Sequence, residues 1–232
     1  GSPTEAWVSR RMLEFEFPAI LRNWTQNDFI QPWVRERAAQ NVRKSASKFQ
    51  RHPYEPCYLF ESAILSMEQF PIRGVIWYQG ESNAHNIEAH EHLFPRLVRS
   101  WREYWQDADM PFYYVQLSSL NRPSWPLFRD SQRRMLATIN NVGMAVSSDK
   151  GNPTDVHPTQ KREVGLRLAC LALNDTYGLR HVVPSGPLFR SVEFRKGMAY
   201  VSFDHADGLR PANEGEELLT FEIAGEDRTF HP

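Results

Sequence analysis

The sequence Gly74-Val75-Ile76-Trp77-Tyr78-Gln79-Gly80-Glu81-Ser82-Asn83 decides the fold class. Its first five residues are a short apolar run that ends at Gln79 and Gly80, a pattern typical of a buried strand. Asn83 is a suitable N-cap for a helix that extends to about Trp105. One face of that helix is apolar, because large apolar residues recur every four positions, at Leu93, Leu97, Trp101 and Trp105.

The alternation of strand and helix patterns continues after this helix. Residues 110–117 and 142–147 predict two more strands, whereas residues 130–139 and 159–174 predict two more helices. Strands that alternate with helices pair in parallel through right-handed crossovers. We therefore expect an α/β domain built on a parallel sheet.

The pattern changes at Pro184-Ser185-Gly186-Pro187. Beyond it, apolar residues near period two and the apolar segments 198–203 and 218–223 predict antiparallel strands joined by glycine-containing turns. We place a boundary here, between an α/β domain at 1–184 and a small β domain at 185–232. The second segment is short for an independent sandwich, so we expect it to be the start of a larger β domain.

The composition narrows the classes of function. The 27 basic and 28 acidic residues give a formal charge of −1, which argues against nucleic-acid binding by overall charge. No apolar run is long enough to predict a membrane-spanning helix. Two cysteines rule out a disulfide-stapled miniprotein. Six cations between Arg35 and Arg51 predict a solvated helix face, with a phosphate-binding patch as the alternative.

Two polar clusters follow predicted strands, one at residues 79–83 and one at residues 149–157. The carboxyl ends of parallel strands share one edge of the sheet, where ligands bind, so we expect both clusters at that edge. A neutral His157 can act as a general base, and Asp155 can hold its tautomer. The alternative is a surface histidine beside a helix-capping aspartate.

The side chains of Gln79 and Asn83 could donate hydrogen bonds to an oxyanion, and Gly80 would let a substrate approach the backbone. Turn and cap roles explain the same residues equally well. Ser82 lacks the Gly-x-Ser-x-Gly context of a nucleophile turn, so we do not expect it to be the nucleophile. No metal site is expected, because the possible ligands lack zinc-site spacing: His85, Glu88 and His92.

Residues 74–83 closely resemble the signature of the sialate O-acetylesterases, SGNH-type hydrolases related to some acetylxylan esterases. Other stretches resemble the family in order and spacing: residues 1–7, residues 155–158 with Lys161 and Gly165, and residues 202–205 and 221–225. The resemblance implies a flavodoxin-like, three-layer parallel sheet. It also implies hydrolysis of acetyl esters on a sugar, typically 9-O-acetyl sialic acid, by a Ser-His-Asp mechanism without metal or organic cofactor.

The resemblance also implies roles for individual residues. His157 would be the general base with Asp155 as its orienting partner, and Gln79 and Gly1 would form part of the oxyanion hole. Contacts to the substrate would come from the turn after the first strand, at Gly80, Glu81 and Asn83. Two positions depart from the family pattern: Thr154, where the wider group carries an acid three residues before the histidine, and Glu61, where relatives often carry Asn. A backbone carbonyl is therefore the alternative partner for His157.

The family's nucleophile lies in a Gly-Gln-Ser-Asn turn, which the 232 residues do not contain. We expect an upstream segment, or an N-terminal chain of the same precursor, to supply this serine to the domain at 1–184. The alternatives are an acetylxylan or other polysaccharide deacetylase and a catalytically inactive sugar-binding fragment. The resemblance implies an extracytoplasmic location, periplasmic or secreted in bacteria and lysosomal or secreted in animals, with no nucleic-acid or membrane partner.

Overall fold

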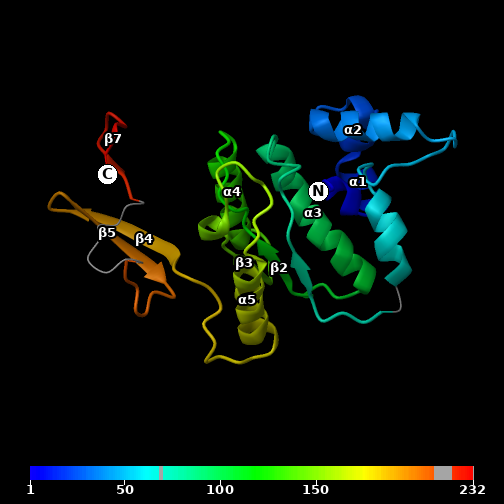
Figure 1. Ribbon diagram of the computed structural model, residues 1–232. Coiled ribbons are helices and arrows are strands. Elements are labelled where there is room, and N and C mark those ends of the chain that lie inside the picture. The colour runs from blue at the N-terminus through cyan, green and yellow to red at the C-terminus, as the bar shows by residue number, and fades with distance from the viewer. Residues whose placement is uncertain (68–69, 212–220, 232) are drawn as a thin grey trace. The chain divides into compact units, whose positions relative to one another are not determined.

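The computed structural model describes residues 1–67, 70–211 and 221–231, in two compact units (Figure 1). The first unit is Gly1–Pro184 and the second is Ser185–Pro232. The division falls where the apolar pattern of the sequence changes.

A parallel sheet of three strands forms the centre of the first unit. In sheet order, the strands are β1 (Val75–Trp77), β2 (Phe112–Val115) and β3 (Val142–Ala145). Trp77 lies opposite Tyr114, which lies opposite Met144. All four residues of β2 are buried, as expected for the central strand of a sheet covered on both faces. The predicted α/β class is confirmed, with strands shorter than the apolar runs.

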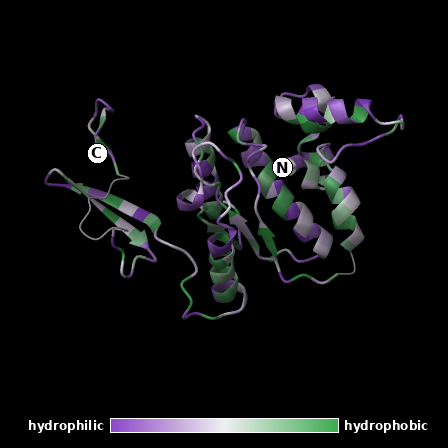
Figure 2. Cartoon of the chain, in the orientation of Figure 1, coloured by the Kyte–Doolittle hydropathy of each residue, from purple (hydrophilic) through white to green (hydrophobic). Residues whose placement is uncertain are grey.

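Two helices cover opposite faces of this sheet (Figure 1). Alternate residues of β2 enter different cores, because successive side chains of a strand point to opposite faces. Phe112 and Tyr114 pack with α3 (Ile87–Trp105), whereas Tyr113 and Val115 pack with α5 (Lys161–Leu171). Apolar positions alternate with polar ones along both helices (Figure 2), so each buries one stripe. The result is a three-layer α/β arrangement.

The remaining helical segments surround this core. The longer ones are α1 (Arg10–Glu16), α2 (Pro32–Arg43) and α4 (Trp125–Arg134). The single-turn segments are η1 (Thr4–Trp7), η2 (Pro18–Leu21), η3 (Trp24–Gln26), η4 (Phe60–Ile64), η5 (Leu65–Met67), η6 (Met135–Ala137), η7 (Ser148–Lys150) and η8 (Ala172–Thr176). Helix α4 begins five residues before the predicted start at Asp130, because a proline is well accommodated in the first turn of a helix, here at Pro126.

Our prediction that Asn83 caps the helix after β1 was wrong. The N-cap of α3 is Asn86, whose Oδ1 accepts a hydrogen bond of 3.0 Å from the backbone N–H of Ala89. Asn83 lies in the preceding turn, where its backbone N–H donates to the Gly80 carbonyl at 2.8 Å. Its side chain is engaged in long-range hydrogen bonds and is therefore unavailable as a cap.

The second unit contains two antiparallel pairs, as the sequence predicts. Strands β4 (Leu188–Arg195) and β5 (Met198–Asp204) form a hairpin closed by Lys196 and Gly197. Both turn residues have positive φ, as the common two-residue hairpin turn requires. The second pair is β6 (Ile223–Ala224) with β7 (Phe230–His231). The predicted segment 218–223 lies partly outside the described residues, which resume at Phe221.

The sequence analysis also led to expectations about membrane-spanning helices, metal ligands and the basic segment at residues 35–51. In the described ranges, no helix is long and apolar enough to span a membrane, and no three His, Cys, Asp or Glu side chains are grouped for a metal ion. Arg35 pairs with Asp28, and Arg51 pairs with Glu55 and Glu61. The basic segment is therefore partly neutralised within the fold, which favours a solvated helix face over a phosphate patch.

Candidate active site

The candidate site lies at the carboxyl edge of the parallel sheet, where β1 and β3 lead into polar loops. Residues 79–83 follow β1, and residues 146–160 connect β3 to α5. The N-terminal loop, residues 1–7, packs against the first of these turns. Trp7 packs edge-on against Trp77 of β1 with ring centroids 5.8 Å apart, and its carbonyl accepts a hydrogen bond of 2.9 Å from Trp101 of α3. These contacts place the loop beside the end of β1.

Thr4 joins the N-terminal loop to the turn after β1. Its backbone N–H donates to Asn83 Oδ1 at 2.9 Å, and its hydroxyl lies 2.7 Å from Gln79 Oε1 and 3.0 Å from Asn83 Oδ1. All three residues are buried. Because buried polar groups cost free energy unless paired, this network fixes the loop on the turn.

Glu5 extends the network into the interior. Its carboxyl accepts a hydrogen bond of 2.8 Å from Asn83 Nδ2, and the residue is only 1% exposed. Burial raises the pKa of this carboxyl from 4.5 to about 7, against the opposing effect of hydrogen bonds from the backbone and from Asn83. A buried glutamate whose pKa is close to neutral pH therefore lies beneath the candidate site.

Gln79 uses both amide hydrogens inside the protein. Nε2 donates to the Ser2 carbonyl at 3.2 Å and to Asn83 Oδ1 at 2.7 Å. An amide nitrogen has only two hydrogens, so Gln79 can donate to an oxyanion only by releasing one partner. The contact to Ser2 is the longer and therefore the weaker of the two.

Ser82 holds the first residue of the chain. Its hydroxyl donates to the Gly1 carbonyl at 2.8 Å, and the residue is 2% exposed. A buried hydroxyl that already donates is poorly placed to attack a substrate. The neighbouring Gly80 allows close packing, since a Cβ there would lie 2.8 Å from Phe128 Cε1. Ser82 and Gly80 therefore support the site structurally.

His157 and Asp155 form a contact pair in the loop before α5. Asp155 Oδ1 lies 3.1 Å from His157 Nδ1 and also accepts from the His157 backbone N–H at 2.9 Å. These hydrogen bonds, the backbone one first, lower the pKa of Asp155. The His157 side chain is 84% exposed, so its other ring nitrogen is accessible. Thr154 instead donates to Asn152, which leaves Asp155 as the partner of His157.

Two contacts hold the His157 loop against the other strand ends. Lys161 Nζ, four residues after His157, lies 4.4 Å from the centroid of the Tyr78 ring, directly before Gln79. Gly151 packs so closely on the segment after β2 that a Cβ would lie 2.4 Å from the Ser119 backbone nitrogen. The turn at residues 79–83 and the His157 loop thus lie at one edge of the sheet, although no hydrogen bond joins them among the described residues.

The structure distributes the predicted site residues unevenly. Gln79 and Asn83 are hydrogen-bonded to each other, Gly1 is bonded to Ser82 in the same turn, and Asp155 and His157 form a separate pair. Glu81, predicted to contact substrate, is half-buried, and Asn83 is buried beneath the surface, so their contacts to substrate remain predictions. Sequence reasoning did not identify three contributors: Thr4, Glu5 and Ser2. The first loop contained them, but no local pattern indicates that they bind the turn after β1.

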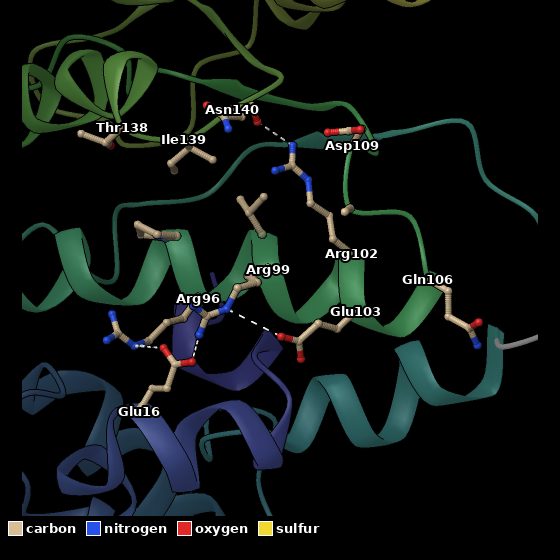
Figure 3. A pocket seen from close by; sticks show the side chains of 13 residues that line it. Glu16, Arg96, Arg99, Arg102, Glu103, Gln106, Asp109, Thr138, Ile139 and Asn140 are labelled. Carbon is tan, nitrogen blue, oxygen red and sulfur yellow. Dashed lines mark hydrogen bonds and ion pairs between the residues drawn. The ribbon is translucent and has the colours of Figure 1, made fainter.

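A separate cavity of about 690 Å³ lies at the opposite edge of the sheet (Figure 3). There, Arg102 donates to the carbonyls of Met110 and Asn140, which precede β2 and β3. Arg96 and Arg99 are both paired with Glu16. Each of the three arginines thus contacts a carboxylate or a backbone carbonyl of the protein.

Comparison with known proteins gives the fold a context. A family model described as "Carbohydrate esterase, sialic acid-specific acetylesterase" matches residues 30–174. A sialate O-acetylesterase of Rattus norvegicus is 28% identical over 259 aligned residues, which cover 97% of this chain and 46% of the rat protein. The Homo sapiens sialate O-acetylesterase is 30% identical over 175 residues, covering 65% of this chain and 34% of the human protein.

A solved structure gives the same association. It is a carbohydrate acetylesterase from Xanthomonas citri, with a TM-score of 0.72 and 32% sequence identity. The match covers all of this chain and 47% of the Xanthomonas citri chain. The chain thus spans about half the length of the relatives that it matches.

Proposed function

Because the chain belongs to the sialic acid-specific acetylesterase family of carbohydrate esterases, we propose that this protein hydrolyses acetyl esters on sialic acid, typically the 9-O-acetyl group. The observation that carries the proposal is the family match across residues 30–174, which span the parallel sheet and both polar loops at its carboxyl edge. The His157–Asp155 pair supports it, because an exposed imidazole beside a carboxylate is suited to base catalysis.

In the proposed mechanism, His157 accepts a proton from a serine hydroxyl as the serine oxygen attacks the acetyl carbonyl carbon. Asp155 holds the imidazole and stabilises its protonated form. The tetrahedral intermediate collapses, the sugar oxygen leaves, and His157 returns the proton to it. Water then attacks the acetyl-serine with His157 again as base, which releases acetate and regenerates the serine.

The developing oxyanion is stabilised by donors near the end of β1. We assign this role to the backbone at Gly1 and to Gln79, whose amide can release the Ser2 carbonyl and turn toward the intermediate. The substrate would contact the turn formed by Gly80, Glu81 and Asn83, and the buried Asn83 side chain would hold the N-terminal loop beside that turn.

We propose that the serine comes from an upstream segment or from an N-terminal chain of the same precursor. The length of the relatives is consistent with this, since the chain spans about half of them. Ser82 is a poor candidate for the nucleophile because its buried hydroxyl is bonded to Gly1. An extracytoplasmic location belongs to the same proposal.

A polysaccharide deacetylase is the second candidate function. The Xanthomonas citri relative is described as a carbohydrate acetylesterase, a broader class than sialate O-acetylesterases. The catalytic residues would be the same, and only the sugar pocket would differ.

Acetate release from the complete protein tests the proposal. We expect faster turnover of 9-O-acetyl sialic acid than of acetylated xylan, and the reverse preference would favour the second candidate. Replacement of the base by His157→Ala should lower kcat by roughly 10³-fold or more. The matched control His181→Ala, at an exposed histidine after η8, should leave kcat unchanged. Activity that survives His157→Ala would refute the assigned base, and a complete protein that hydrolyses neither ester would refute the esterase function.

A further inference from the structure

Glu5 is a buried carboxyl group that the proposed mechanism does not use. It lies in η1, directly after Thr4, and receives the Nδ2 hydrogen bond of Asn83. A carboxyl group is costly to bury, and this one lies within the N-terminal loop, next to the residue that bonds the loop to the turn after β1. Its carbonyl also accepts a hydrogen bond of 2.9 Å from the Cys57 backbone N–H, so the backbone of the residue is fixed as well.

The hydrogen bonds leave one orientation for the Asn83 amide. The Thr4 backbone N–H can only donate, so the Asn83 atom that faces it, 2.9 Å away, must be the oxygen. The amide nitrogen must then face Glu5, which accepts from it at 2.8 Å. If Glu5 could not accept this hydrogen bond, the buried Asn83 N–H would be left without a partner, which would favour rotation of the Asn83 amide.

The orientation of Asn83 in turn sets that of Gln79. Asn83 Oδ1 accepts one Gln79 amide hydrogen at 2.7 Å, and the other hydrogen is directed to the Ser2 carbonyl. The contacts therefore form a chain from Glu5 through Asn83 and Gln79 to Ser2. We call these four residues the Glu5 relay.

We propose that Glu5 is a positioning residue, which orients the Asn83 and Gln79 amides and thereby the Gly1–Ser2 loop for ester hydrolysis. This inference rests on the proposed function. Glu5 does not touch the substrate; it acts through the relay, which includes Gln79, one of the donors assigned to the oxyanion.

Burial keeps Glu5 uncharged below about pH 7, although the hydrogen bond from Asn83 favours its ionised form. Burial raises the pKa of this carboxyl to about 7, and its partner Asn83 is neutral. On the element packed against Glu5, the Cys57 thiol is also neutral, since burial raises its pKa to about 12. The charged groups that act on the Cys57 thiol are Arg10, Arg51, Glu61 and Glu14, and both arginines pair with Glu61. Ionisation of Glu5 above about pH 7 would thus place a charge in the interior with no cation partner among the described residues, and we expect it to disturb the relay.

Two substitutions in the complete protein separate positioning from mere packing. Glu5→Gln keeps the size and an acceptor oxygen but cannot ionise, whereas Glu5→Met keeps the volume and removes the acceptor. Hydrolysis of p-nitrophenyl acetate measures kcat and KM for both without a sugar contribution. At about pH 6 we expect Glu5→Gln to keep kcat within about threefold and Glu5→Met to lose about 10- to 100-fold in kcat with KM little changed.

The pH profile supplies a second readout. The parent should lose activity above about pH 7 as Glu5 ionises, and Glu5→Gln should remain active there. Full activity of Glu5→Met, or equal loss in both variants at every pH, would overturn the inference. Urea unfolding of each variant shows whether a loss comes from unfolding.

A readout without activity separates this inference from the proposed function. In ¹⁵N-labelled complete protein, the side-chain amide signals of Asn83 and Gln79 should shift between about pH 6 and pH 8 in the parent but not in Glu5→Gln. If these signals shift as expected while no ester is hydrolysed, the relay stands and the esterase proposal fails. If the parent hydrolyses esters but its amide signals do not respond to pH, the relay is refuted.

Discussion

Replacing Glu5 by glutamine should make the stability of this protein less dependent on pH. In the folded parent, the Glu5 carboxyl has a pKa of about 7, whereas a solvated glutamate, as in the unfolded chain, has a pKa of 4.5. The folded state therefore binds this proton more tightly than the unfolded state does. It follows that the free energy of unfolding of the parent declines as the pH rises from about 4.5 to about 7.

The size of the effect follows from the two pKa values. Each pH unit between them corresponds to about 1.4 kcal/mol, so the interval from 4.5 to about 7 amounts to roughly 3 kcal/mol. Solvent screening does not reduce this figure much, because the residue is only 1% exposed. Below about pH 4.5 the carboxyl is neutral in both states and causes no loss, whereas above about pH 7 the full loss is present.

Urea unfolding at several pH values measures the effect. We expect the free energy of unfolding of Glu5→Gln, minus that of the parent, to increase by about 3 kcal/mol between about pH 4 and pH 8. Glu14→Gln is a matched control, since Glu14 is an exposed carboxyl on the neighbouring helix α1. Its difference from the parent should not change by a comparable amount.

A difference between Glu5→Gln and the parent that stays constant with pH would refute the reasoning, because it would mean that Glu5 titrates alike in both states. A difference that decreases with rising pH would mean that the folded state favours the ionised carboxylate. Either result would also remove the physical basis for the expected pH response of the relay.

Three further substitutions test other contacts. Lys161→Met should remove the contact with the Tyr78 ring and lower kcat/KM about two- to fivefold, and Lys161→Arg should restore it, as steady-state kinetics would show. Arg102→Met should leave buried carbonyls unpaired and lower the free energy of unfolding by about 2–4 kcal/mol in urea, with kcat per folded molecule unchanged. Ser82→Ala should release the Gly1 carbonyl and reduce kcat, yet a serine-directed phosphonate should still label the complete protein; loss of labelling would make Ser82 the nucleophile.

The sequence predicted the elements that depend on local apolar patterns. The runs that became β2 and β3 are apolar because a parallel sheet covered on both faces buries nearly every side chain of these strands. In β1, Val75 and Trp77 are buried but Ile76 between them is 68% exposed, so the predicted burial holds for one face of that strand. The change of pattern at Pro184 was equally visible, since antiparallel strands alternate with period two. Helix limits were less accurate: the predicted start at Asp130 missed Trp125, because Pro126 resembles a loop residue in sequence yet fits the first helical turn.

Only part of the candidate site could be predicted from the sequence. Asp155 and His157 are two residues apart, so their contact at 3.1 Å arises from the local turn, and spacing alone could suggest it. The bonds from the N-terminal loop to Asn83 join positions 78 and 79 residues apart in the chain. No local propensity encodes such a contact, which is why Asn83 was taken for a helix cap when Asn86 fills that position.

The sequence by itself thus determined the α/β class and the change to antiparallel strands, and it supplied the candidates that we propose for acyl-transfer chemistry. Only the tertiary structure decided how those residues are used. It engaged both hydrogens of the Gln79 amide, bonded Ser82 to Gly1 and buried Glu5 where its carboxyl is near neutrality. The physical reason is that hydrogen-bond partners and the loss of water around a charge are set by packing between distant segments, whereas hydrophobic periodicity is set residue by residue along the chain.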